Sequence, residues 1–159
     1  MKYHIKYFLF ILLIPFINPR RLIWLYGSTK NVLVKSICIR RLKKWSISIS
    51  SGAIISPSVK FPHPQNIVIG RGVVIEDEVV IYQGVTIGAS NGTIVIHEDE
   101  LNNYYPYIKK KATIYTNSVV AGGICIWEYS VIGANSFVNK DVPDKMIYAG
   151  NPARSILEI

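Results

Sequence analysis

Histidine is the side chain best suited to acid–base chemistry near neutral pH, and this 159-residue chain has three, His4, His63 and His97. A single histidine can act first as a general base and then as a general acid. His4 lies in a basic, apolar stub at the start of the chain, where no catalytic role is expected. His63 stands between Pro62 and Pro64, at a proline-stiffened corner where a repeat begins. We therefore take His63 as the first catalytic candidate, with a hydrogen-bonded structural histidine as the alternative.

A second group of polar and aromatic side chains follows Ile87, where the repeat is interrupted. It contains His97, a run of acids and the sequence Tyr104-Tyr105-Pro106-Tyr107. Aromatic faces pack on sugar rings, and carboxylates accept hydrogen bonds from hydroxyl groups. This composition is typical of a carbohydrate site, and a solvated surface loop is the alternative. The predicted substrate-binding residues are Tyr82, Glu98, Asp99, Tyr104 and Tyr105.

A repeat of six residues must position these side chains, because Ile or Val recurs at every sixth position in two blocks. The positions are Ile69, Ile75, Ile81 and Ile87, and then Ile108, Ile114, Val120, Ile126, Ile132 and Val138. Neither the helical period of 3.6 nor simple strand alternation explains this spacing. It predicts a parallel β-helix in which branched side chains stack inside and Gly, Asn and Asp form the turns. The twenty-one residues from Ile87 to Ile108 break the phase, which predicts an excursion loop over about residues 89–107.

The positive charge of the chain is concentrated in its first half. The formal net charge is +8, yet no Asp or Glu occurs before Glu76, and residues 1–75 carry twelve Lys or Arg. A uniformly basic nucleic-acid-binding domain does not divide in this way, so no nucleic-acid partner is expected. Residues 1–48 also hold many apolar and aromatic residues, which favours a helical segment that caps the coil, contacts an anionic membrane, or does both.

The apolar run from Tyr7 to Ile17 is too short to span a membrane, and no small-residue cleavage site follows it. We therefore expect a retained, non-spanning segment. Two cysteines, Cys38 and Cys125, are too few for a disulfide framework and are compatible with a reducing cytoplasm. Both are expected to be small buried hydrophobic residues.

Several motifs resemble the hexapeptide-repeat acyltransferases, whose fold is a left-handed parallel β-helix with three hexapeptides in each triangular coil. These are His63-Pro64-Gln65-Asn66-Ile67-Val68-Ile69-Gly70, Ile81-Tyr82-Gln83-Gly84-Val85-Thr86-Ile87-Gly88, Lys140-Asp141-Val142-Pro143 and Ala149-Gly150-Asn151-Pro152-Ala153-Arg154. They look like the serine acetyltransferase branch, which also includes O-acetyltransferases of bacterial capsule, exopolysaccharide and lipopolysaccharide sugars. The resemblance implies a mainly β fold, with a left-handed β-helix over residues 49–156 behind a short helical segment over residues 1–48.

The resemblance also implies a cytoplasmic homotrimer that takes an acetyl group from acetyl-CoA without a metal. His63 matches the position of the family's catalytic histidine. Gln83, close to the residue one three-hexapeptide coil after His63, and His97 are candidates to orient it; Glu98 and a backbone carbonyl are alternatives. Lys140 and Arg154 are candidates to bind the phosphates of acetyl-CoA. The candidate acetyl-CoA contacts by family position are Ala121, Gly122, Ala134, Ser136, Lys140, Gly150, Asn151 and Arg154.

Departures from the serine acetyltransferase pattern favour a different acceptor. Those enzymes carry Asp immediately before the catalytic histidine, where Pro62 stands, and Arg-His-Pro in the loop, where Tyr104-Tyr105-Pro106 stands. Their orienting Asp also has no counterpart. Recognition of serine needs a charge for each of its ends. We therefore predict an O-acetyltransferase acting on a sugar hydroxyl of a bacterial surface glycan or its precursor, at the inner face of the cytoplasmic membrane.

Three alternatives accompany this prediction. The nearest is a serine O-acetyltransferase of cysteine biosynthesis, and another is a non-catalytic β-helix scaffold. The third, a metal-dependent hydratase on the same fold, needs three histidine ligands, which the spacing of His4, His63 and His97 disfavours.

Overall fold

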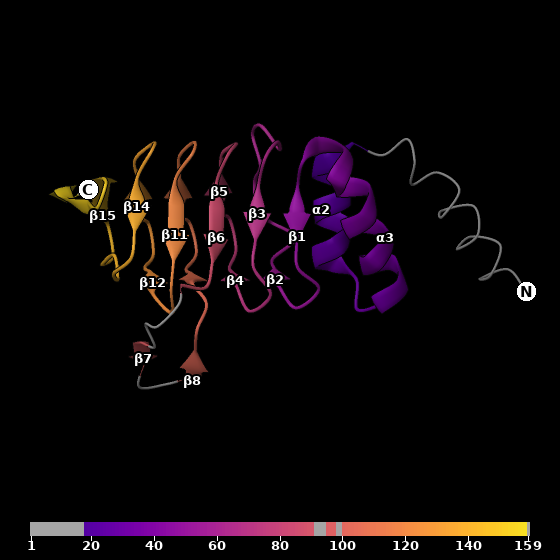
Figure 1. Cartoon of the computed structure of the whole chain (residues 1–159), viewed down its shortest axis with the longest axis horizontal. Coiled ribbons are helices and arrows are strands. Elements are labelled where there is room, and N and C mark those ends of the chain that lie inside the picture. The colour runs from indigo at the N-terminus through magenta and orange to yellow at the C-terminus, as the bar shows by residue number, and fades with distance from the viewer. Residues whose placement is uncertain (1–17, 91–94, 98–99, 159) are drawn as a thin grey trace, which may run out of the picture.

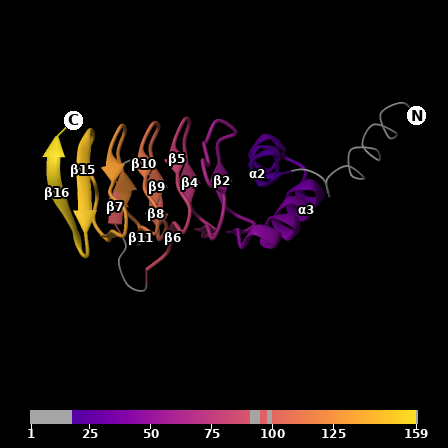
Figure 2. The ribbon, with the colours of Figure 1, turned by 90° about the horizontal axis from the view of Figure 1, so that it is seen from above.

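The computed structural model of the chain describes residues 18–90, 95–97 and 100–158. Two helices, α2 (Pro19–Ser28) and α3 (Val32–Leu42), and a short 3₁₀ helix, η2 (Lys43–Trp45), come first. A stack of short strands follows and ends in a C-terminal hairpin. Figure 1 shows the helices at one end of an elongated body and β15 at the other. In the perpendicular view of Figure 2, β16 closes that far end.

Three sheets form the sides of the stack, and the chain visits them in turn. Face A contains β1 (Ser48–Ile49), β3 (Val68–Ile69), β6 (Thr86–Gly88), β11 (Val119–Ala121) and β14 (Phe137–Val138). Face B contains β2 (Ile54–Ile55), β4 (Val74–Ile75), β9 (Tyr107–Ile108) and β12 (Cys125–Ile126). Face C contains β5 (Val80–Ile81), β10 (Thr113–Ile114), β13 (Val131–Ile132), β15 (Met146–Gly150) and β16 (Ala153–Glu158). All pairs within these faces are parallel except β15 with β16, so the predicted parallel β-helix is confirmed.

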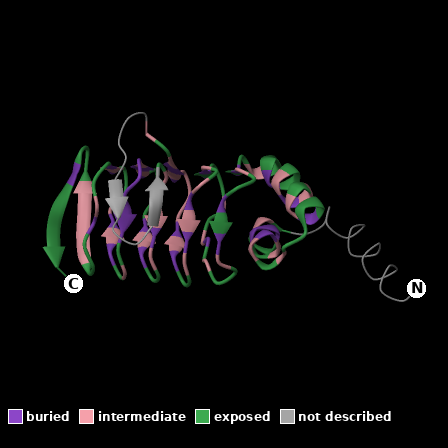
Figure 3. Ribbon diagram, turned by 90° about the horizontal axis from the view of Figure 1, so that it is seen from below, coloured by how far each residue is buried: buried purple, intermediate pink, exposed green. Residues whose placement is uncertain are grey.

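The branched residue of each hexapeptide points into the stack. All ten Ile and Val residues of the repeat are buried, and they pair with their counterparts one coil away, as Ile69 does with Ile87 and Ile114 with Ile132. Figure 3 shows this buried interior along the strands. Burial of one such side chain contributes about 1.5–3 kcal/mol, and this continuous column is the main stabilising feature.

The coils are not all of one length. Val68 pairs with Thr86, which is the spacing of three hexapeptides. Ser48 pairs with Val68, so the first coil is longer than three hexapeptides by two residues. Val74 pairs with Tyr107, and the coil between them is much longer because an excursion leaves the stack after β6. The longest coil thus lies where the sequence predicts an excursion, and the first coil departs from the regular three-hexapeptide length by two residues.

The two helices pack their apolar sides on the first coil. Asn18 and Asn31 cap them, since their side chains accept hydrogen bonds from the first-turn N–H groups of α2 and α3. The hydroxyl of Tyr26 donates to the carbonyl oxygen of Ala53 at 2.8 Å, which ties α2 to the coil. Cys38 is buried in α3, and burial raises the pKa of its thiol to about 11. Neither described helix has the length and apolar character required to cross a membrane.

Candidate functional site

His63 lies at the corner between faces C and A, where the first coil has its two additional residues. It follows Lys60, which pairs with Val80 on face C, and precedes β3 on face A. Its carbonyl oxygen accepts a hydrogen bond from the N–H of Gln65 at 2.9 Å, which closes a tight turn. The imidazole is exposed to solvent. A reactant can therefore reach it directly.

Two tyrosines on face C form the surface beside this imidazole. The ring centroid of Tyr82 lies 6.3 Å from that of His63, with the planes tilted by 44°. Tyr82 stacks in turn on Tyr115, with 4.9 Å between centroids. Of the predicted substrate-binding residues, Tyr82 is thus the one that the structure brings to His63, and Tyr115 is an aromatic neighbour that the sequence reasoning missed.

Gln83 belongs to the same corner on the next coil. Lys60 pairs with Val80, two residues more than three hexapeptides, whereas the N–H of Gly84 donates to the carbonyl oxygen of Gln65. Gln83 is therefore level with Gln65, and His63 lies within the two-residue insertion just before it. The backbone carbonyl of Gln83 accepts hydrogen bonds from Asn117 and Thr116. Its side-chain Oε1 atom is buried, and no group in the described part of the chain donates to it. This orphan acceptor fits the predicted orienting role, which stays a prediction.

Arg20 reaches the same corner from helix α2, although it is distant in sequence. Its Nε–H donates to the carbonyl oxygen of Phe61 at 3.0 Å, and its Nη2 group donates to that of Pro62. The Pro62 carbonyl belongs to the peptide bond that enters His63. A contact between residues so far apart in the chain has no local sequence signal. Only the Asn18-Pro19 helix start could have suggested that Arg20 sits in a first helical turn.

The excursion leaves at a different corner, between faces A and B. It contains the antiparallel pair β7 (Val95–His97) and β8 (Glu100–Asn103), which projects from the stack in Figure 1. The side chain of His97, together with Glu98 and Asp99, lies outside the described residues. Tyr104 is half exposed. Tyr104 follows β8 and precedes face B, so it belongs to this corner and not to that of His63.

Tyr105 does not offer a free aromatic face. Its ring packs over Gly72 on the preceding coil, where a Cβ atom would lie only 2.3 Å from Tyr105 Cδ2. The absence of a side chain at Gly72 therefore allows the excursion to close back on the coil. Tyr105 is half-buried against the core, and its predicted role in substrate binding stays a prediction.

The predicted donor-site residues gather near the C-terminal end of the stack. Lys140 and Arg154 line one pocket of about 320 Å³, together with Asn139 and Tyr148. The N–H of Gly150 donates to Ser136 Oγ at 3.1 Å. The remaining candidates are more dispersed: Ala121 pairs with Gly88, Gly122 lies near Ser90 with a φ of +105°, and Ala134 and Asn151 are exposed.

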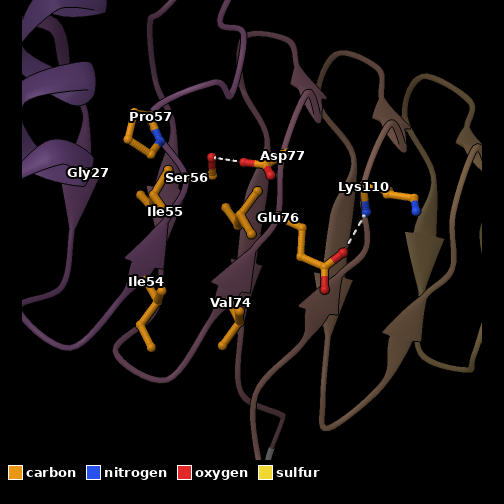
Figure 4. Close-up of a pocket in the computed structure, with 10 residues that line it drawn as sticks. Gly27, Ile54, Ile55, Ser56, Pro57, Val74, Glu76, Asp77 and Lys110 are labelled. Atoms are coloured by element: carbon orange, nitrogen blue, oxygen red, sulfur yellow. Dashed lines mark hydrogen bonds between the residues drawn. The ribbon is translucent and has the colours of Figure 1, made fainter.

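A second hollow of about 480 Å³ lies on face B, near the end of α2 (Figure 4). Polar groups at this hollow form hydrogen bonds with one another. The hydroxyls of Ser56 and Ser58 donate to Asp77, and the N–H of Lys110 donates to Glu76 at 2.9 Å. These two hydroxyls lower the pKa of the Asp77 carboxyl. The hollow contains none of the predicted site residues.

Comparison with known proteins identifies the relatives of this chain. No family model matches it. A serine acetyltransferase of Buchnera aphidicola subsp. Acyrthosiphon pisum is 30% identical over 136 residues, which cover 86% of this chain and 47% of that protein. One of Bacillus subtilis is 36% identical over 112 residues, which cover 70% and 48%. The chain belongs to the serine acetyltransferase-like branch of the hexapeptide-repeat acyltransferases.

Solved structures of this branch have the same fold. A serine acetyltransferase in complex with CoA has a TM-score of 0.66 and 28% identity, covering 87% of this chain and 54% of that one. One from Brucella abortus strain S19, in complex with coenzyme A, has a TM-score of 0.69 and 28% identity, covering 88% and 54%. The chain thus spans about half the length of these relatives and structures.

The predicted sugar acceptor and role in polysaccharide synthesis are wrong, because these relatives and structures are serine acetyltransferases. The prediction rested on missing charges around His63 and on an aromatic loop suited to sugar rings. Arg20 supplies a cation at the His63 corner, and the ring of Tyr105 is packed on Gly72.

Proposed function

We propose that this protein is an acetyl-CoA-dependent serine O-acetyltransferase with His63 as its general base. The observation that carries this proposal is an exposed imidazole at the position of the family's catalytic histidine, in a chain 30–36% identical to serine acetyltransferases. A cytoplasmic location accompanies the proposal, because both substrates are cytoplasmic metabolites.

In this mechanism, His63 removes the proton from the serine hydroxyl as its oxygen attacks the thioester carbonyl of acetyl-CoA. The oxyanion that forms then collapses, the carbon–sulfur bond breaks, and the leaving thiolate takes the proton from the imidazolium. The products are O-acetylserine and coenzyme A, and His63 returns to its neutral form. Gln83, whose buried Oε1 has no donor among the described residues, lies at this corner on the next coil and is the proposed partner that holds the imidazole in position.

The pocket of Lys140 and Arg154 is the proposed site for the phosphates of the donor. Two cations in one pocket suit phosphate recognition. His63 precedes β3 and Lys140 follows β14, so along the stack they lie three strands apart, roughly 14 Å at about 4.8 Å per strand, at opposite edges of face A. The arm of coenzyme A between sulfur and phosphate has about thirteen bonds and extends roughly 16 Å. The proposed path of the donor therefore runs obliquely across face A.

A homotrimer is the proposed assembly. His63 lies at the corner between faces C and A, whereas the excursion leaves between faces A and B. Within one chain, the excursion thus starts at the edge of face A opposite to His63. A neighbouring copy can place its excursion over this histidine, which supports the predicted site between subunits. The left-handed sense of the coil, implied by the resemblance, belongs to the same proposal.

Peripheral contact of the helices with an anionic membrane is a separate proposal. Trp24, Val32 and Leu33 are exposed, the last two by 74% each. Residues 18–47 around them carry eight Lys or Arg and no acid. Apolar side chains among cations are typical of interfacial helices. The proposal predicts sedimentation with phosphatidylglycerol vesicles and not with phosphatidylcholine vesicles; equal recovery with both contradicts it.

Activity of the full chain with L-serine and acetyl-CoA tests the proposed function, with release of free thiol as the readout. We expect His63→Asn to lower kcat by about 100-fold or more, while acetyl-CoA binding measured by calorimetry is retained. His4→Asn is the matched control and should leave turnover unchanged. Near-wild-type turnover of His63→Asn, or no turnover of serine by the wild type, overturns the proposal.

A further inference from the structure

Arg20 carries an incompletely used guanidinium at the catalytic corner. Two of its N–H groups, on Nε and Nη2, donate to the carbonyl oxygens of Phe61 and Pro62. A guanidinium has five N–H donors in a planar fork. The second hydrogen on Nη2 and both on Nη1 have no acceptor among residues 18–90, 95–97 and 100–158, and they lie along the other edge of the group. That edge belongs to an exposed side chain, so a ligand can reach it.

No carboxylate neutralises this cation. The sequence contains no Asp or Glu before Glu76, and across residues 18–90, 95–97 and 100–158 Arg20 forms no ion pair. Its hydrogen-bond partners are carbonyl oxygens, which orient the group and leave its full positive charge in place. An exposed, oriented guanidinium of this kind is well suited to bind a carboxylate through two parallel hydrogen bonds.

We propose that Arg20 binds the α-carboxylate of the acceptor amino acid and so determines acceptor specificity. This inference rests on the proposed serine O-acetyltransferase function. It assigns a specificity role to helix α2, because Asn18 and Pro19 begin the helix so that Arg20 falls in its first turn, against the peptide that enters His63. The two carbonyl contacts hold the guanidinium at a set position relative to this peptide.

The dimensions of serine fit this arrangement. Its hydroxyl oxygen lies roughly 4 Å from its carboxylate oxygens, from standard bond lengths. Hydrogen bonds of about 3 Å at each end allow the guanidinium and the imidazole to be up to about 10 Å apart. Arg20 contacts the carbonyl of Pro62, the residue adjacent to His63, and so lies within this span. A neutral amide of the same size offers the guanidinium one uncharged acceptor oxygen in place of a carboxylate and so gains less from it.

Competition between L-serine and L-serinamide tests the proposal, because the amide has the same hydroxyl and lacks the carboxylate. The wild type should prefer L-serine in kcat/KM. Arg20→Gln should reduce that preference by about 10- to 100-fold, the effect expected for loss of hydrogen bonds between charged groups. Arg20→Lys keeps the positive charge but loses the planar pair of N–H donors. Its preference for L-serine should lie between those of the wild type and Arg20→Gln. Arg21→Gln removes the neighbouring exposed arginine and should keep the wild-type preference.

The ratio of two acceptors within one variant does not depend on the fraction of folded enzyme. If Arg20 only stabilises the backbone at the corner, Arg20→Gln will slow the acetylation of both acceptors equally. The preference for L-serine will then not change, which overturns the proposal. An unchanged KM for acetyl-CoA alongside a raised KM for L-serine supports it. Failure of the wild type to acetylate L-serine overturns the proposed function together with this inference, whereas serine turnover with an unchanged preference in Arg20→Gln overturns the inference alone.

Discussion

Replacement of Gln83 by leucine should raise the stability of the protein and lower its activity at the same time. Gln83 Oε1 is buried and accepts no hydrogen bond from any group in the described ranges. An unsatisfied buried acceptor costs about 1–3 kcal/mol, and leucine has a similar volume without the polar atoms. We therefore expect Gln83→Leu to raise the free energy of unfolding by about 1–2 kcal/mol, which for a chain of this size raises Tm by about 2–8 °C.

Activity should move in the opposite direction, since Gln83 lies at the corner of His63 on the adjacent coil, level with Gln65, and is the proposed orienting partner. A misoriented base lowers kcat by about 10- to 100-fold. The paired assay is thermal unfolding followed by circular dichroism, together with turnover of L-serine at a temperature where all variants are folded. Gln65→Leu is the control, because Gln65 is exposed at the same corner and should change stability by no more than about 0.5 kcal/mol.

Two results would refute the reasoning. A lower Tm for Gln83→Leu than for the wild type means that Oε1 has a donor in the native protein and is not an orphan acceptor. A raised Tm with unchanged kcat means that the acceptor is unsatisfied without serving His63, and the orienting role is then wrong. Only the combination of higher stability and lower turnover supports both statements.

Three further predictions follow from the donor pocket, the hollow on face B and the core. The double replacement Lys140→Ala with Arg154→Ala should weaken coenzyme A binding by about 10-fold or more and leave S-acetylpantetheine binding unchanged in calorimetry, because only the former carries the phosphates; equal weakening of both contradicts the assignment. The pKa of Asp77 is lowered in the folded protein, so its stabilising contribution is present above about pH 4 and is lost as the pH falls through the folded-state pKa. Ser56→Ala should raise the pKa of Asp77 toward its ordinary value, as measured by a carboxyl ¹³C titration, and should reduce the loss of stability on acidification. An unchanged pKa of Asp77 argues against the hydrogen bond from Ser56. Ile114→Ala should lower the free energy of unfolding in urea by about 2–5 kcal/mol, because the side chain is fully buried in the stack, and a loss below about 1 kcal/mol contradicts the stacking.

Local repetition explains why so much of the fold could be predicted. In a β-helix each hexapeptide meets its counterpart one coil away, so the inward side chain must be aliphatic at a fixed interval, and Ile69, Ile75 and Ile81 display that rule in the sequence alone. The corner of His63 was predictable for the same reason, since the repeat begins there between two prolines. The excursion was predictable because the interval from Ile87 to Ile108 is not a whole number of coils.

The acceptor prediction failed because it depended on contacts between residues far apart in the chain. Pro62 and Tyr105 were interpreted as lost charges and a gained aromatic surface. In the folded chain, Arg20 reaches the His63 corner from helix α2, and Tyr105 packs on Gly72. Neither contact follows from the sequence period or from a local motif.

The sequence by itself thus determined the repeating coil, its interior and the position of its leading catalytic candidate, because these depend on residues at regular spacing. Only the tertiary structure decided what surrounds that histidine. Two additional residues in the first coil form the turn that carries it beside Tyr82, and the packing of α2 on that coil brings Arg20 to the same corner. Such neighbours are set by the length of a coil and the docking of a helix, which are global properties that no local stretch of sequence encodes.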